Sequence, residues 1–226
     1  MQRQFEHELD EIKRAILTMA GLVEKALGDA ARSLAEQDTA LAEAVVAMDD
    51  EIDRWEVEID RLATTFIARH QPTATDLRFV IVAIKLGPEL ERIADNAVNI
   101  SQRVLHLAKY PLLKPLIDLP RMLAQAQAMV TDAIAAYVDR DARSAREIID
   151  RDDQVDALYM QVFRELLTFM IEDPKTISRA IDLILVARFA ERIADQATNI
   201  SEEVVYLVEA TPIRHLQVLE ERRDEP

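Results

Sequence analysis

The sequence predicts an all-α fold, a tandem repeat of two antiparallel three-helix bundles made from six long helices. Half of the residues are hydrophobic and only three are glycine, a composition typical of long packed helices. Apolar residues recur at alternating spacings of four and three, which indicates helices that pack along a seam. Residues 91–101 recur at 191–201, with nine of eleven positions identical, so one structural unit is used twice.

The first half of the chain contains three such apolar stripes. They run through residues 5–30, 41–66 and 86–107. Asp38 and Thr39 can cap the second helix, and the Gln-Pro-Thr sequence at 71–73 separates the second helix from the third. Because these connections are short, we expect neighbouring helices to be antiparallel.

A proline-rich segment at 110–120 divides the chain. Its three prolines end the third helix and delay the fourth, since proline cannot continue a helix interior. We therefore predict a first bundle over residues 1–112, a second over 113–212 and a C-terminal tail over 213–226.

The helical pattern restarts in the second half. A fourth helix follows the apolar stripe 119–137, and a fifth begins at Asp141 and continues to about residue 171. Asp173 as N-cap, with proline at the first helical position, predicts the start of the sixth helix. Its apolar stripe covers 183–207 and ends near the Thr-Pro pair at 211–212.

Charge and composition exclude several classes of function. The chain has 27 basic and 42 acidic residues, a net charge of −15 that repels nucleic acid. It has no cysteine, and its four histidines are scattered without ligand spacing, so any metal must be held by oxygen. The N-terminus lacks an apolar signal region, and the apolar run 79–84 is too short to span a bilayer. We expect a cytoplasmic protein with no transmembrane segment.

Each half carries two pairs of acidic residues spaced four apart, one pair on its second helix and one on its third. Like charges at this spacing lie on one helix face and repel each other. If the two helices face one another, four carboxylates converge in each half, and hard metal ions are the natural partners of such oxygen-rich sites. Iron, zinc, nickel, manganese, magnesium and calcium all stay open. The predicted metal ligands are Asp49, Asp53, Glu91 and Asp95 in the first half and Asp152, Asp156, Glu191 and Asp195 in the second.

Other interpretations of the acidic pairs compete with metal binding. In a chain with 42 acidic residues, such pairs can simply face water, and Arg92 and Arg192 can neutralise nearby acids. The repetition of all four pairs in register favours the metal. No histidine follows a glutamate at the spacing of ferritin-like di-iron enzymes, and no glycine-rich phosphate loop is present. We expect no enzyme activity; the alternatives are a metal-dependent phosphohydrolase and a purely structural helical scaffold.

These motifs resemble those of the PhoU family over nearly the whole chain. The resemblance rests on the two Glu-Arg-Ile-Ala-Asp segments at 91–95 and 191–195, the partner aspartate pairs and the stretch 76–86. It implies two three-helix bundles that bind multinuclear metal clusters, with the first four ligands in one site and the last four in the other. Among the metals, we expect iron first.

The resemblance also implies a role that spacing alone does not. A PhoU-like protein is expected to be a cytoplasmic negative regulator of the phosphate-starvation response. It would be an adaptor that links a Pst-type phosphate ABC transporter to a PhoR-like sensor histidine kinase and acts by binding. Association with the membrane surface through those partners, and a homodimer, stay open.

Overall fold

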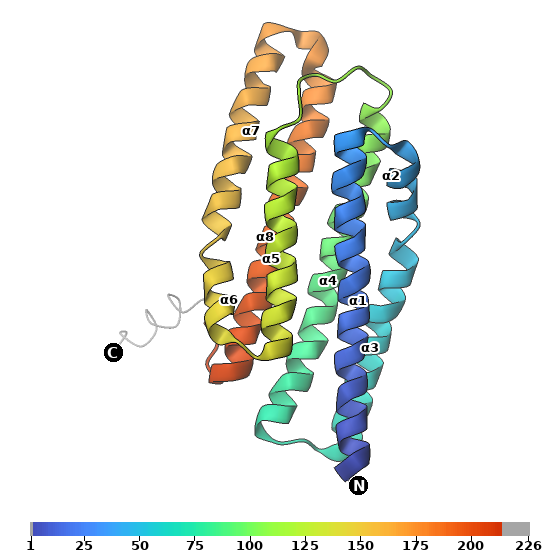
Figure 1. Cartoon of the computed structure of the whole chain (residues 1–226), viewed down its shortest axis with the longest axis vertical. Coiled ribbons are helices and arrows are strands. Elements are labelled where there is room, and N and C mark those ends of the chain that lie inside the picture. Colours follow the sequence, from blue (N-terminus) through green and yellow to red (C-terminus); the bar gives the residue numbers. More distant parts are fainter. Residues whose placement is uncertain (1, 214–226) are drawn as a thin grey trace, which may run out of the picture.

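The computed structural model describes residues 2–213, which are helical apart from short connections and contain no strand. The all-α prediction and the doubled three-helix architecture are confirmed (Figure 1). Of the predicted tail at 213–226, all but Ile213 lies outside the described residues. The elements of the first half are α1 (Gln2–Glu36), α2 (Thr39–Val46), α3 (Asp49–His70) and α4 (Ala74–Leu107). The second half contains α5 (Asp118–Asp139), α6 (Ala142–Ile149), α7 (Asp152–Glu172), the short 3₁₀ helix η1 (Pro174–Thr176) and α8 (Ile177–Glu209).

The second predicted helix of each half differs from expectation, because a two-residue break divides it. The breaks lie at 47–48 and 150–151, where α2 gives way to α3 and α6 to α7. At the first break the amide of Met48 donates to the carbonyl of Val45, the tighter i to i−3 bond of a 3₁₀ turn. Asp49 and Asp152 thereby become the first residues of new helices, where the helix dipole favours negative charge.

The predicted aspartate caps are confirmed. Asp38 accepts a hydrogen bond from the amide of Leu41 at 3.0 Å and begins α2. Asp141 accepts from two amides at the start of α6, and Asp173 caps η1, which leads directly into α8. Each aspartate satisfies amides that have no partner within their own helix.

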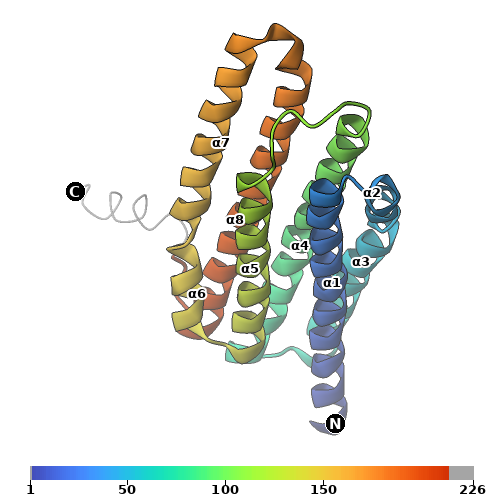
Figure 2. The same cartoon turned by 45° about the horizontal axis from the view of Figure 1, so that its top comes forward.

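The two bundles share one hydrophobic core, in which α4 and α8 are the central pair. These two helices make the most extensive helix–helix contact in the described chain, and α1 also packs on α5 across the same boundary. Figures 1 and 2 both show α4 and α8 side by side, with α1 to α3 on one side and α5 to α7 on the other. Buried apolar residues from both halves form a single cluster.

Helices α4 and α8 run antiparallel, as their polar contacts demonstrate. Residues later in α4 pair with residues earlier in α8. The two copies of the repeated segment meet near their middles. From the start of α4 onward, Arg78 bonds the carbonyl of Leu207, Lys85 bonds Glu203, Glu89 bonds Asn199, and Asn96 bonds Gln196. Because equivalent residues of the two repeats face each other, the halves are related by an approximate two-fold axis beside the Asn96–Gln196 pair.

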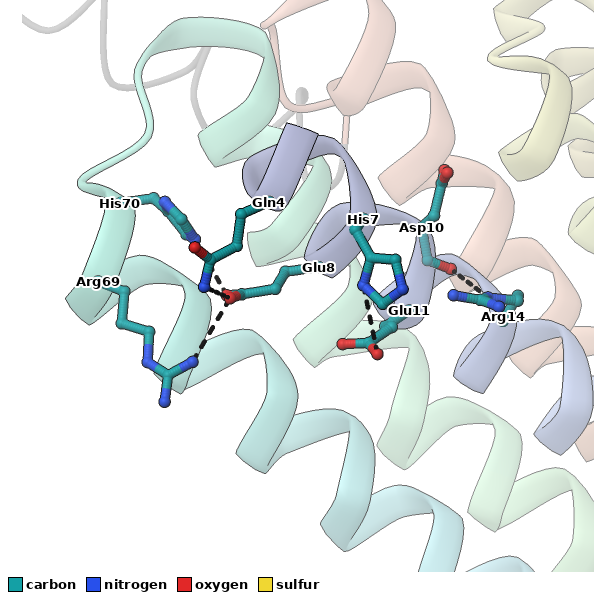
Figure 3. Close-up of polar contacts among 8 residues, drawn as sticks. All are labelled: Gln4, His7, Glu8, Asp10, Glu11, Arg14, Arg69 and His70. Carbon is teal, nitrogen blue, oxygen red and sulfur yellow. Dashed lines mark hydrogen bonds and ion pairs between the residues drawn. The ribbon is translucent and has the colours of Figure 1, made fainter. Parts of the chain in front are cut away.

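A polar and aromatic cluster joins the start of α1 to the end of α3, and Figure 3 shows its polar contacts. His70 Nε2 lies 3.0 Å from Glu8 Oε2, and Arg69 reaches the other carboxylate oxygen. The hydrogen bond from His70 lowers the pKa of Glu8. The rings of Phe5, Phe66 and His70 pack together beneath these contacts. His70 therefore has a structural explanation in the first bundle.

Within residues 2–213, no helix combines the length and the apolar character needed to cross a membrane.

Candidate functional site

The first acidic set consists of Asp49 and Asp53 on α3 and Glu91 and Asp95 on α4. Helices α3 and α4 pack against each other, so the start of α3 meets the middle of α4. Asp49 and Glu91 are half-buried, whereas Asp53 and Asp95 are exposed. The set therefore has two inner carboxylates next to the core and two outer ones in contact with water.

The carboxylates of α3 and α4 influence one another's ionisation. Burial raises the pKa of Glu91 to about 7, and the charges of Asp95 and Asp53 add to this effect. Burial also raises the pKa of Asp49, as do the charges of Asp53 and Asp95. The pKa of Asp95 is raised by burial and by Asp53. Asp49, Glu91 and Asp95 thus resist ionisation because they are partly buried and because neighbouring carboxylates are negative.

The second acidic set consists of Asp152 and Asp156 on α7 and Glu191 and Asp195 on α8, and it repeats the first. The pKa of Asp152 is raised to about 6, mainly by burial and then by the charges of Asp195 and Asp156. The pKa values of Glu191 and Asp195 are raised as well, again chiefly by burial. The structure therefore brings the eight predicted residues together as two groups of four.

Two oxygens of the second acidic set are buried without a hydrogen-bond partner among the described residues. They are Oδ1 of Asp152 and Oε2 of Glu191, and the Glu191 residue is only 9% exposed. A buried acceptor left unsatisfied costs about 1–3 kcal/mol. A bound cation would satisfy both oxygens and would also reduce the repulsion within the set.

The chemistry of both sets fits a hard, oxygen-binding cation, because every donor is a carboxylate oxygen. Within residues 2–213, however, no three acidic or histidine side chains already have the arrangement of a finished metal site. A cation would therefore have to draw the exposed outer carboxylates inward. Metal binding by these eight residues stays a prediction.

Two further residues, which the spacing motifs do not include, lie beside these sets. The charge of Glu56 on α3 raises the pKa of Glu91, and the Arg188 guanidinium donates a hydrogen bond to Glu191. Each could have been found from its spacing, since Glu56 lies three residues after Asp53 and Arg188 three residues before Glu191.

Comparison with known proteins bears on both repeats. A family model described as "PhoU domain" matches residues 16–104 and again residues 119–204. The two matches each cover one predicted bundle and contain one acidic set.

Individual relatives match over nearly the full length. The chain is 39% identical to a phosphate-specific transport system accessory protein PhoU homolog of Pseudomonas putida, covering 96% of this chain and 85% of that protein. The crystal structure of PhoU from Pseudomonas aeruginosa superposes with a TM-score of 0.89 at 38% identity, covering 92% of this chain and 100% of that one. The phosphate transport system regulatory protein PhoU from Streptococcus pneumoniae gives 0.86 at 28% identity, covering 92% and 99%.

Proposed function

The chain belongs to the PhoU family, and from that premise we propose that it is a cytoplasmic accessory regulator of phosphate uptake that acts by binding rather than by catalysis. The observation that carries this proposal is the match of both repeats to the family, together with one acidic set in each repeat. In this role the protein restrains the phosphate-starvation response when phosphate is plentiful. It does so as an adaptor between a Pst-type phosphate ABC transporter and a PhoR-like sensor histidine kinase.

The names of the relatives support the link to the transporter. The Pseudomonas putida relative is named an accessory protein of a phosphate-specific transport system, and the Streptococcus pneumoniae protein a regulatory protein of phosphate transport. The link to a sensor kinase follows from the family resemblance.

We further propose that the two acidic sets bind multivalent cations, iron foremost, and that these cations help partners to dock. The raised pKa values of Glu91 and Asp152 and the two unsatisfied oxygens support cation binding. A chain with a net charge of −15 repels other acidic surfaces. Cations in the acidic sets would lower that repulsion at two defined places on the molecule.

Metal content tests the cation part of the proposal. Protein purified without chelator is compared by elemental analysis with the double variant Glu91→Gln/Glu191→Gln. We expect the variant to retain several-fold less metal, because each set loses one of its inner carboxylates. The matched control is Glu51→Gln/Glu172→Gln, which removes the same charge at exposed positions. Equal and low metal content in all three proteins would refute cation binding.

Gene expression tests the regulatory part independently. Deletion of the gene should raise the expression of phosphate-starvation genes in phosphate-rich medium, and the wild-type gene should restore repression. Unchanged expression after deletion would rule out the regulatory role. Complementation with Glu91→Gln/Glu191→Gln then reveals whether repression needs the acidic sets, with Glu51→Gln/Glu172→Gln as the control.

A further inference from the structure

A polar groove lies between the two repeats, on the surface of the central α4–α8 pair. Its cavity volume is about 380 Å³. All of the side chains that line it are polar. They are Arg92, Asp95, Asn96 and Asn99 from α4 and Arg188, Arg192, Asp195 and Gln196 from α8. We call this the inter-repeat groove.

The groove lies on the approximate two-fold axis that relates the repeats, so it receives matching groups from both sides. Asn96 Nδ2 donates to Gln196 Oε1 at 3.2 Å and to the carbonyl of Arg92 at 2.8 Å. Asn96 is only 6% exposed, which fixes these amides beneath the groove. Arg92 and Arg192 stand at equivalent positions on the two helices above them.

Three guanidinium groups bring positive charge to this groove, next to its two aspartates, within a strongly acidic chain. Arg92 donates one hydrogen bond to Glu89 at 3.3 Å, and Arg188 donates one to Glu191. Within the described part of the chain, Arg192 makes no hydrogen bond or ion pair of its own. Because each guanidinium offers five donors in a planar fork, most of the donors facing the groove stay available to an oxyanion.

We propose that the inter-repeat groove binds inorganic phosphate directly, an activity beyond the proposed role as an adaptor. Arginine forks match the oxygen geometry of phosphate, and the amides add neutral donors. The lining residues offer no aromatic or aliphatic side chain on which a nucleobase could pack. A free phosphate ion therefore fits this groove better than a nucleotide.

The two aspartates of the groove provide selectivity for phosphate. Asp95 and Asp195 repel a fully ionised anion, which has no proton to share. At neutral pH a phosphate ion still carries one or two hydroxyl protons and can donate a hydrogen bond to a carboxylate. Sulfate has the same tetrahedral shape but is fully ionised at neutral pH and carries no such proton, so the aspartates discriminate against it.

Calorimetric titration of the full chain with inorganic phosphate tests this proposal. A chelator is present throughout, so that binding through a cation in the acidic sets does not contribute. We expect phosphate to bind about tenfold more tightly than sulfate, and Arg92→Gln/Arg192→Gln to weaken phosphate binding at least about tenfold. The control is Arg143→Gln/Arg164→Gln, two exposed arginines outside the groove, which should bind phosphate as the wild type does.

Several outcomes would overturn the proposal. They are no heat of binding up to about 10 mM phosphate, equal affinity for sulfate, or unchanged affinity in the Arg92→Gln/Arg192→Gln variant with native circular dichroism. Phosphate binding that needs added Mn²⁺ and disappears in Glu91→Gln/Glu191→Gln would place phosphate on the acidic sets instead. Since the main titration is free of metal and of partners, its failure leaves the metal and gene-expression tests of the proposed function unaffected.

Discussion

Arg188 makes the two acidic sets unequal. Its guanidinium bonds Glu191, so the second acidic set already contains a positive charge from the protein itself. The equivalent position in the first repeat is Pro88, which has no charge to offer Glu91. Burial raises the pKa of both glutamates, but the charge of Arg188 partly opposes this effect at Glu191, while the pKa of Glu91 reaches about 7. A cation entering the second set competes with Arg188 for Glu191, whereas among the described residues no guanidinium bonds Glu91, which feels only the charge of Arg92.

Replacing Arg188 should therefore strengthen cation binding at the second set. An ion pair with a partly exposed arginine is worth about 0.2–1 kcal/mol, so we expect Arg188→Gln to bind Mn²⁺ up to about fivefold more tightly at that set. Calorimetric titration with Mn²⁺ resolves the two sets when Glu91→Gln is added to silence the first. Arg143→Gln, at an exposed position on α6, controls for the change in net charge. Unchanged or weaker binding in Arg188→Gln would contradict this account.

Glu91 should make the metal-free protein less stable as the pH rises. Its pKa is 4.5 in an ordinary environment and about 7 in the folded protein. Between these values the folded state holds a proton that the unfolded chain has lost, so the free energy of unfolding falls with increasing pH. Because water reaches this carboxylate and screens it, we expect the loss to be on the order of 1 kcal/mol.

Urea unfolding in chelator at about pH 5 and about pH 8 measures this loss. Glu91→Gln should show a smaller decrease between the two pH values than the wild type, and Glu51→Gln should behave like the wild type. In the wild type, Mn²⁺ in place of the chelator should restore the free energy of unfolding at the higher pH, since the ion replaces the proton. The same decrease in wild type and Glu91→Gln would show that another group is responsible.

The acidic residues could be identified from the sequence, but their individual environments could not. The four-residue spacing and the repeat select all eight carboxylates. Which member of each pair is buried depends on how neighbouring helices pack, and spacing does not contain that information. Spacing likewise places Arg188 one turn from Glu191, but it does not tell whether that arginine bonds the glutamate or faces water.

At the scale of the elements, the helix breaks position the acidic sets. The apolar spacing continues across both breaks, because the chain leaves the helix for only two residues and keeps the same buried face. A periodicity argument therefore predicts one helix where the structure has two. The caps, by contrast, depend on local residues alone, and Asp38, Asp141 and Asp173 were predicted correctly.

The short helix α2 should depend on its cap. Asp38 satisfies the amide of Leu41, and α2 has only eight residues. We expect Asp38→Ala to lower the free energy of unfolding by about 1 kcal/mol, measured in urea. Asp38→Asn keeps a side-chain oxygen that can accept the same bond and should stay within a few tenths of a kcal/mol of the wild type. Similar losses in both variants would mean that charge, and not the cap, is what matters.

At the scale of the whole molecule, the antiparallel contact between α4 and α8 makes one body of two repeats. The sequence predicts the duplication but not how the copies meet, because both faces of the third helix in each bundle are apolar enough to be buried. Polar contacts settle the arrangement. Asp182, which is 4% exposed on α8, pairs with Arg103 and His106 of α4. The predicted division at 112 and 113 falls in the connection between α4 and α5.

We predict that both repeats unfold in a single transition, because they share one hydrophobic core. The chain offers a direct test. Its one tryptophan, Trp55, lies on α3 and reports on the first repeat, whereas circular dichroism follows the helices of both. The two signals should give the same midpoint in urea. Asp182→Asn, which weakens the contact between repeats, should lower both midpoints together by an amount equivalent to about 1–2 kcal/mol. A fluorescence midpoint separate from that of circular dichroism would show that the repeats are independent domains.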